Sequence, residues 1–229
     1  DPDVARELLI SCLDTEAKKL DVSVSFETLP DALFDALPAV REVCAFEELE
    51  ISVSNLTSHR LEELMKGVKH AHFQTHTTTT LPDELFAPEL EWLTVYGMKQ
   101  LTEIPEAIGN AKSLILLDLV APKVKKLPKG IAKLPLVTIS IDVTIPELDL
   151  AMWPTLKNAY LKGMIKKVVG HDKVPLLEDY TQSCGMKSVP EALWTAKKLE
   201  RVWIWYDGFD DFDDVKAKFE KRGVRFAQA

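Results

Sequence analysis

Two pairs of possible metal ligands stand at matching spacing in the first third of the chain. His70 and His72 are separated by one residue, and so are Glu48 and Glu50, which lie 22 positions earlier. Because alternate residues of a β-strand point to the same face, each pair presents its two side chains together if its segment is extended. Imidazole nitrogens and carboxylate oxygens bind zinc, so this quartet is a candidate metal site. The alternative is a solvated polar surface in which the carboxylates favour protonation of the imidazoles.

The sequence carries no motif of a known catalytic chemistry. It has no phosphate-binding P-loop, no G-x-G-x-x-G, no G-x-S-x-G and no H-E-x-x-H. We therefore expect the chain not to be an enzyme and to hold no cofactor.

Aromatic residues and arginine form a second group of candidates. Arg201, Trp203 and Trp205 alternate along one segment, and Trp92, Tyr96 and Tyr160 stand in corresponding segments earlier in the chain. Trp, Tyr and Arg are the residue types that dominate protein–protein hot spots. For Trp203 and Trp205 the alternative is that the residues after them fold over both rings.

These residues belong to an internal repeat. An aliphatic residue, a proline, two variable residues and a second aliphatic residue occur together five times, beginning at Leu29, Leu81, Ile104, Leu127 and Val189. Three apolar residues spaced L-x-x-L-x-L begin at positions 46, 68, 90, 114, 136, 156, 177 and 199, a period of 20 to 24 residues. One unit cannot bury its own apolar face, so consecutive units must stack.

Over about residues 29–206 this pattern resembles the leucine-rich-repeat family, in particular its irregular cytoplasmic and effector-type members. The resemblance implies an α/β solenoid, with a curved parallel β-sheet on the concave face and short helices and turns on the convex face. Two features depart from the family. Its asparagine ladder is missing, since the corresponding places hold Met98, Pro122, Thr144, Met164 and Gly185. Gln182 also stands where the family has an apolar residue, which leaves the register of the seventh repeat open.

The repeat assigns the side chains on the concave face of eight strands, at the third, fifth and seventh places of each unit. Equivalent places on adjacent strands lie about 4.8 Å apart, so Glu48 and Glu50 should adjoin His70 and His72. The third-place row is Glu48, His70, Trp92, Leu116, Thr138, Asn158, Asp179 and Arg201; the fifth-place row is Glu50, His72, Thr94, Asp118, Ser140, Tyr160, Thr181 and Trp203. The seventh-place row is Ser52, Gln74, Tyr96, Val120, Asp142, Lys162, Ser183 and Trp205. From these rows we predict a partner-binding surface of His70, His72, Trp92, Tyr96, Asp118, Asn158, Tyr160, Arg201, Trp203 and Trp205.

We expect one domain over residues 1–229, with an amino-terminal cap over 1–45, repeats over 46–206 and a carboxy-terminal cap over 207–229. Helical spacing over 4–20 and alternation over 22–26 predict a helix and then a strand in the first cap. Helical spacing over 215–219, followed by Gly223 and an apolar segment, predicts a helix and a closing strand in the second.

Composition restricts the partner and the location. The 229 residues carry a net charge of −8, which argues against nucleic acid as the main partner. No apolar stretch approaches the roughly 18 residues of a membrane span. Three separated cysteines suit a reducing compartment, so we expect a cytoplasmic protein, with a secreted effector as the alternative. The predicted function is a non-catalytic module that binds another protein on its concave face; the alternatives are the metal site and the targeting domain of a larger enzyme or effector.

Overall fold

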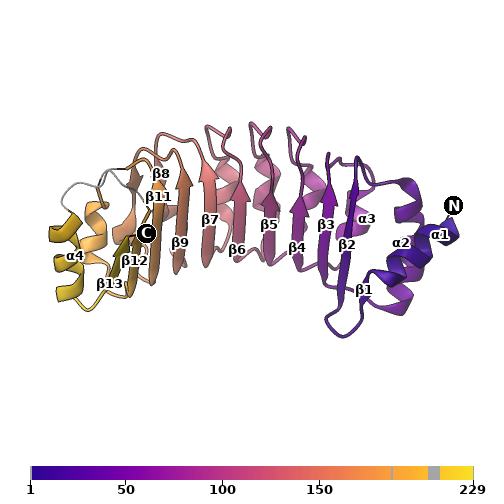
Figure 1. Ribbon diagram of the computed structural model, residues 1–229, viewed down its shortest axis with the longest axis horizontal. Helices are drawn as coiled ribbons and strands as arrows, with labels where there is room; N and C mark the ends of the chain where they lie inside the picture. Colours follow the sequence, from indigo (N-terminus) through magenta and orange to yellow (C-terminus); the bar gives the residue numbers. More distant parts are fainter. Residues whose placement is uncertain (1, 187, 206–211, 229) are drawn as a thin grey trace.

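The computed structural model describes residues 2–186, 188–205 and 212–228. Its main feature is an 11-stranded sheet in the order β1-β2-β3-β4-β5-β6-β7-β9-β11-β12-β13, drawn across the front of Figure 1. The strands are β1 Leu13–Asp14, β2 Lys19–Phe26, β3 Glu48–Val53, β4 His70–Gln74, β5 Trp92–Tyr96, β6 Leu116–Val120, β7 Thr138–Val143, β9 Asn158–Gly163, β11 Asp179–Cys184, β12 Arg201–Ile204 and β13 Arg225–Gln228. From β2 to β13 every pair is parallel, and β1 is antiparallel to β2.

Short helical turns lie behind the sheet and return the chain to the start of the next strand (Figure 1). They are α3 Leu61–Met65, η1 Asp83–Leu85, η2 Glu106–Asn110, η3 Lys129–Lys133, η4 Leu150–Met152, η5 His171–Lys173 and η6 Glu191–Thr195. Two short strands on this side, β8 Leu148–Asp149 and β10 Val168–Val169, pair with each other.

The repeated prolines start the helical segments, as the motif predicts. Pro82, Pro105, Pro128 and Pro190 stand immediately before η1, η2, η3 and η6, and Pro30 stands before the longer helix α2, Asp31–Val43. Proline fixes φ and lacks an N–H, so it favours an extended residue followed by a turn. In all five copies of the motif the proline therefore starts a helical segment.

The core lies between the sheet and these turns and contains the apolar residues of the repeat. Leu93 and Val95 of β5, for example, are fully buried. Trp153 is also buried, and its indole N–H donates to the carbonyl of Ile131 at 2.9 Å.

The seventh repeat keeps the register of its neighbours although Gln182 replaces an apolar residue. Gln182 pairs with Leu161 on one side and Ile204 on the other, and it is fully buried. Its amide is satisfied internally: the Tyr180 hydroxyl donates to Oε1 at 3.1 Å, and Nε2 donates to the Met186 carbonyl at 3.2 Å. The polar side chain is tolerated there because it has hydrogen-bond partners.

Threonine hydroxyls form hydrogen bonds between neighbouring turns in this chain, which lacks the asparagine ladder of the family. Thr75 donates to the Ser54 carbonyl at 2.8 Å, and Thr144 donates to the Pro122 carbonyl at 2.7 Å. The Leu56 N–H donates to the Thr78 hydroxyl, also at 2.8 Å. Each bond joins turns of neighbouring repeats. Each also gives a partner to a backbone carbonyl or N–H that lies outside the strands.

The amino-terminal region differs from the sequence prediction. The first helix, α1, ends at Ser11 rather than continuing to residue 20, and residues 19–26 form β2. Leu13 and Asp14 form β1 instead, which pairs antiparallel with β2, and Lys18, with a positive φ of 51°, lies in the turn between these two strands. Residues 1–45 thus supply strands of the sheet as well as α1 and α2.

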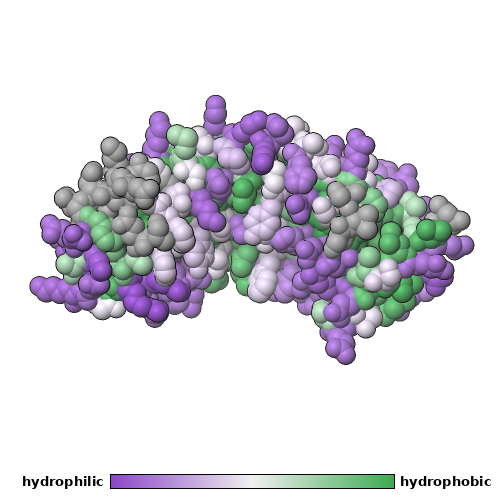
Figure 2. Space-filling model, viewed as in Figure 1, coloured by the Kyte–Doolittle hydropathy of each residue, from purple (hydrophilic) through white to green (hydrophobic). Residues whose placement is uncertain are grey.

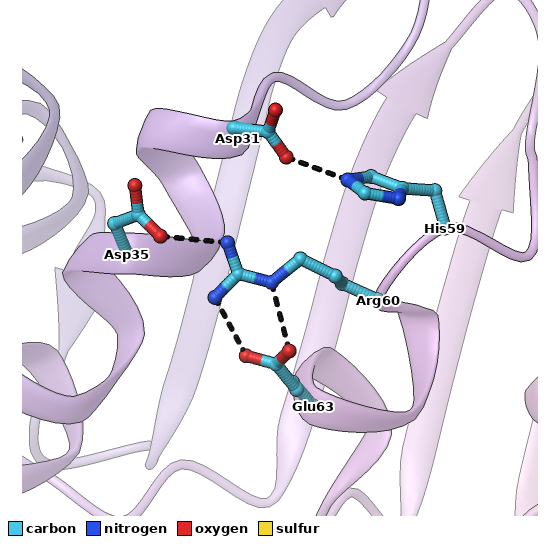
Figure 3. A network of polar contacts seen from close by, with 5 residues as sticks. All are labelled: Asp31, Asp35, His59, Arg60 and Glu63. Atoms are coloured by element: carbon cyan, nitrogen blue, oxygen red, sulfur yellow. Dashed lines mark hydrogen bonds and ion pairs between the residues drawn. The ribbon is translucent and has the colours of Figure 1, made fainter.

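A polar network fastens α2 to the next repeat (Figure 3). Arg60, just before α3, donates to Asp35 of α2 at 2.6 Å and forms a two-point contact with Glu63 at 2.8 and 2.9 Å. His59 lies 2.5 Å from Asp31 at the start of α2. The two-point contact with Glu63 holds the Arg60 side chain within its own repeat, and the contacts to Asp35 and Asp31 link it and His59 to α2.

At the other end, α4 Phe212–Lys221 and β13 are present where the sequence predicts a helix and a strand. Phe219 is fully buried and stacks on Trp194 at 4.3 Å, and Arg222 donates to the carbonyls of Leu193 and Ala196 at 3.0 and 2.7 Å. β13 continues the sheet beside β12.

Candidate functional site

The surface of the sheet that faces away from the helical turns is called here the open face. It carries the third-, fifth- and seventh-place side chains of the repeats, while the residues between them are buried. The predicted neighbours are confirmed along the whole third-place row, from Glu48 beside His70 to Asp179 beside Arg201. They are also confirmed along the whole fifth-place row, from Glu50 beside His72 to Thr181 beside Trp203. Eight of the ten residues proposed for partner binding belong to these two rows, Tyr96 pairs with Gln74 on the neighbouring strand, and Trp205 lines a hollow of the same face together with Arg201 and Trp203.

At the β2 end of the open face lies a charged group that sequence analysis found only in part. Lys19 of β2 contacts Glu50 at 2.6 Å, Glu48 at 3.5 Å and Asp21 at 3.6 Å. The hydrogen bond to Glu50 raises the pKa of Lys19. Lys19 and Asp21 were missed because Leu20 pairs with Leu49, 29 residues later, and this spacing breaks the period of the other repeats. The alternation of Leu20 and Val22 was the available signal.

The metal-site alternative gains no support from this geometry. Glu48 and Glu50 contact the Lys19 ammonium, the ring of His70 stacks on Trp92 at 4.3 Å, and His72 packs edge-on against Tyr96 at 5.2 Å. Within the described quartet of Glu48, Glu50, His70 and His72, the ion pair between a histidine and a carboxylate is that of His70 and Glu48, at 4.0 Å. In the part of the chain that the structure describes, no three His, Cys, Asp or Glu side chains are grouped so that they could hold a metal ion.

Two aromatic side chains stand out from the middle of the open face. Trp92 is 45% exposed and Tyr96 is 37% exposed, although both rings are large and apolar. The Tyr96 hydroxyl donates to Asp118 of the next strand at 2.8 Å. Burial of the hydroxyl, and then this hydrogen bond, raise the pKa of Tyr96 to about 12. The tyrosine is thus a neutral, oriented donor at physiological pH.

The open face is hollowed between β6 and β12. The hollow has a volume of about 740 Å³ and is lined by Leu116, Asp118, Thr138, Ser140, Tyr160, Lys162, Thr181, Ser183, Arg201, Trp203 and Trp205. Two of the lining side chains bond residues outside this lining: Arg201 donates to Asp179 through two bonds of 2.7 and 2.8 Å, and Thr138 accepts from Asn158 at 3.0 Å. Trp205 is 51% exposed at one end of the hollow.

Figure 2, which views the molecule from the same side as Figure 1, shows the open face as a mostly purple and pale surface. Green, apolar residues gather instead toward the amino-terminal helices. On the neighbouring strands Trp92 lies between His70 and Leu116, and Tyr96 lies beside Gln74, so both polar and apolar residues adjoin the rings.

No family model matches this chain, and no curated protein matches its sequence. Among solved structures, a leucine-rich-repeat protein of Leptospira interrogans superposes with a TM-score of 0.64 at 16% identity, over 91% of this chain and 59% of that one. The leucine-rich-repeat domain of the type III effector XopL superposes with a TM-score of 0.62, also at 16% identity, over 99% of this chain and 81% of that one.

This chain has the leucine-rich-repeat fold. The family resemblance of the sequence is thereby confirmed at the level of fold. The chain spans 59% of the length of the Leptospira protein. Among the described residues of this leucine-rich-repeat solenoid, none of the helices combines the length and apolarity needed to cross a lipid bilayer.

Proposed function

We propose that this leucine-rich-repeat solenoid is a non-catalytic interaction module that binds another protein on its open, concave face. The observation that carries the proposal is the exposure of Trp92 and Tyr96 on the most regular part of the sheet. Large exposed aromatic rings are the residue types that dominate protein–protein hot spots.

The construction of the site favours tight contact. Both rings belong to β5, which is paired on each side, and each ring is held by a neighbour: Trp92 by His70, and Tyr96 by His72 and Asp118. Rings that are already fixed lose little conformational entropy on binding. The adjacent hollow between β6 and β12 offers room for a side chain or loop of the partner.

A cytoplasmic location is part of this proposal, with secretion as an effector remaining the alternative. Cys12 and Cys44 are free thiols, which suits a reducing compartment. Nucleic acid is a poor partner for this face, because its carboxylates would repel phosphate groups.

The test is affinity capture from a lysate of the source organism, followed by mass spectrometry. The bait is the native chain, and Trp92→Ala/Tyr96→Ala is the parallel variant. If the two rings are hot spots, the double variant should lose at least about 2 kcal/mol of binding free energy for a protein that the native chain captures.

The matched control is Val43→Ala/Met164→Ala, which removes two exposed apolar side chains (52% and 62% exposed) outside the open face. A partner that is lost with the ring variant but kept by this control supports the proposal. A partner bound equally by all three proteins contradicts the assignment of the open face.

A further inference from the structure

The open face is not uniform in charge. Its part from β2 to β6 carries the carboxylates of Asp21, Glu48, Glu50 and Asp118 against one ammonium group, that of Lys19. One cation in contact with three carboxylates cannot neutralise them. With neutral histidines this part of the face therefore keeps a net charge of −3, derived from four carboxylates and one ammonium.

The part from β6 to β12 is nearly balanced by comparison. Arg201 is paired with Asp179, and Lys162 lies on the strand next to Asp142. The excess negative charge of the open face is thus concentrated on one side of Asp118.

The three carboxylates around Lys19 remain open to a partner. Their side chains are 40%, 42% and 39% exposed for Asp21, Glu48 and Glu50, whereas Lys19 itself is only 25% exposed. The carboxylates are therefore more accessible to a partner than the Lys19 ammonium that contacts them.

Exposed rings lie in the same part of the open face as these anions. Trp92 is in the same row as Glu48, with His70 between them, and Tyr96 bonds Asp118. Aromatic rings attract cations through their π-electrons, and carboxylates pair with the same cations. Arginine suits both kinds of contact, because its guanidinium stacks on rings and donates in a planar fork.

We propose that the partner presents an arginine- or lysine-rich segment to an acidic–aromatic patch made of Asp21, Glu48, Glu50, Trp92, Tyr96 and Asp118. This inference rests on the proposed function and specifies its partner. An acidic segment would be repelled at the same place, and a neutral one would not compensate the excess negative charge of the patch.

The test uses a phage-displayed library of random linear peptides as the probe and the full chain as the target. Selection on the native chain should enrich Arg and Lys over the input library and deplete Asp and Glu. A synthetic copy of an enriched peptide should bind about fivefold or more weakly to Glu48→Gln/Glu50→Gln, and its affinity for the native chain should fall as salt is raised.

The control is Glu103→Gln/Asp172→Asn, which removes the same amount of charge from two exposed residues outside the open face. It should keep the native affinity, and circular dichroism should show all variants folded. Equal weakening by both variants, or enrichment without a bias toward Arg and Lys, overturns the inference.

The outcomes also separate this inference from the proposed function. Peptides that lack a cationic bias but are lost with Trp92→Ala/Tyr96→Ala leave the open face as a protein-binding surface and refute only the basic partner. If no peptide is enriched on the native chain, and an oligosaccharide array binds instead, both proposals fail.

Discussion

At the scale of single residues, Tyr96 connects the aromatic and the acidic features of the open face. Burial and the hydrogen bond to Asp118 raise its pKa from 10.0 to about 12. Because the neutral phenol is favoured in the folded chain, the stabilisation is complete below pH 10 and is lost as the pH rises through about 12. Ionisation of this hydroxyl would also end its donation to the carboxylate.

We expect an ultraviolet titration of the folded chain to contain a tyrosinate component near pH 12 that Tyr96→Phe removes. Asp118→Asn should shift this component to lower pH, because the neighbouring negative charge is removed. Far-ultraviolet circular dichroism should confirm that the chain is folded over the range used. A component that is insensitive to Asp118→Asn would show that burial alone sets the pKa.

Glu47 gives a prediction in the acid range. Its carboxylate accepts from Lys69 at 2.7 Å and from Lys18 at 2.9 Å, and these bonds lower its pKa from 4.5 to about 2. Because the pKa of Glu47 is lower in the folded chain than in the unfolded chain, its ionised form stabilises the fold. This stabilisation is present above pH 4.5 and is lost as the pH falls through about 2. Glu47→Gln should therefore be less stable than the native chain at neutral pH, and the difference should vanish toward pH 2 in denaturant titrations.

The effect of Glu47→Gln should be small, because all three side chains are exposed. Glu84→Gln is a suitable control, since Glu84 has no ion pair among the described residues. A stability difference between native chain and Glu47→Gln that persists unchanged at pH 2 would contradict the assigned role.

At the scale of elements, two glycines with positive φ separate two costs of adding a side chain: the strain of the backbone conformation and the clash with close neighbours. Gly67 follows α3 with φ 76° and has open space around it, whereas Gly97 follows β5 with φ 79° and faces the carbonyl of Thr75. Gly67→Ala should cost about 1–2 kcal/mol of stability from the left-handed conformation alone. Gly97→Ala should cost about 2–5 kcal/mol, because the added methyl must also displace a backbone carbonyl.

Equilibrium unfolding in urea measures both variants, and the difference between them isolates the packing contribution. Gly67→Ala thus serves as the matched control for Gly97→Ala. Equal destabilisation would mean that the turn after β5 relaxes to admit the methyl group.

Elements also show how far the sequence could predict the site. The rows of the open face followed from a period of 20 to 24 residues, because stacked repeats force equivalent places into register. Lys19 was not predicted because α2 lengthens its repeat, and the contacts of Glu48 and Glu50 with Lys19 were not predicted for the same reason. Side-chain pairing depends on every strand beside a residue, so the unpredicted pairing of β2 with β3 changed the interpretation of the whole quartet.

At the scale of the molecule, the solenoid should respond to damage locally, because each repeat contacts only its neighbours. Phe219 of α4 is fully buried between Trp194 and Phe226, so Phe219→Ala should cost about 3–5 kcal/mol. We expect hydrogen exchange to show lost protection in β12 and β11 and little change in β3 to β5. Phe34→Ala in the buried face of α2 should give the reverse pattern, with the loss confined to β2 and β3. A uniform loss of protection in either variant would mean that the sheet unfolds as one cooperative unit, and the ends would then support the open face as a whole rather than their nearest repeats.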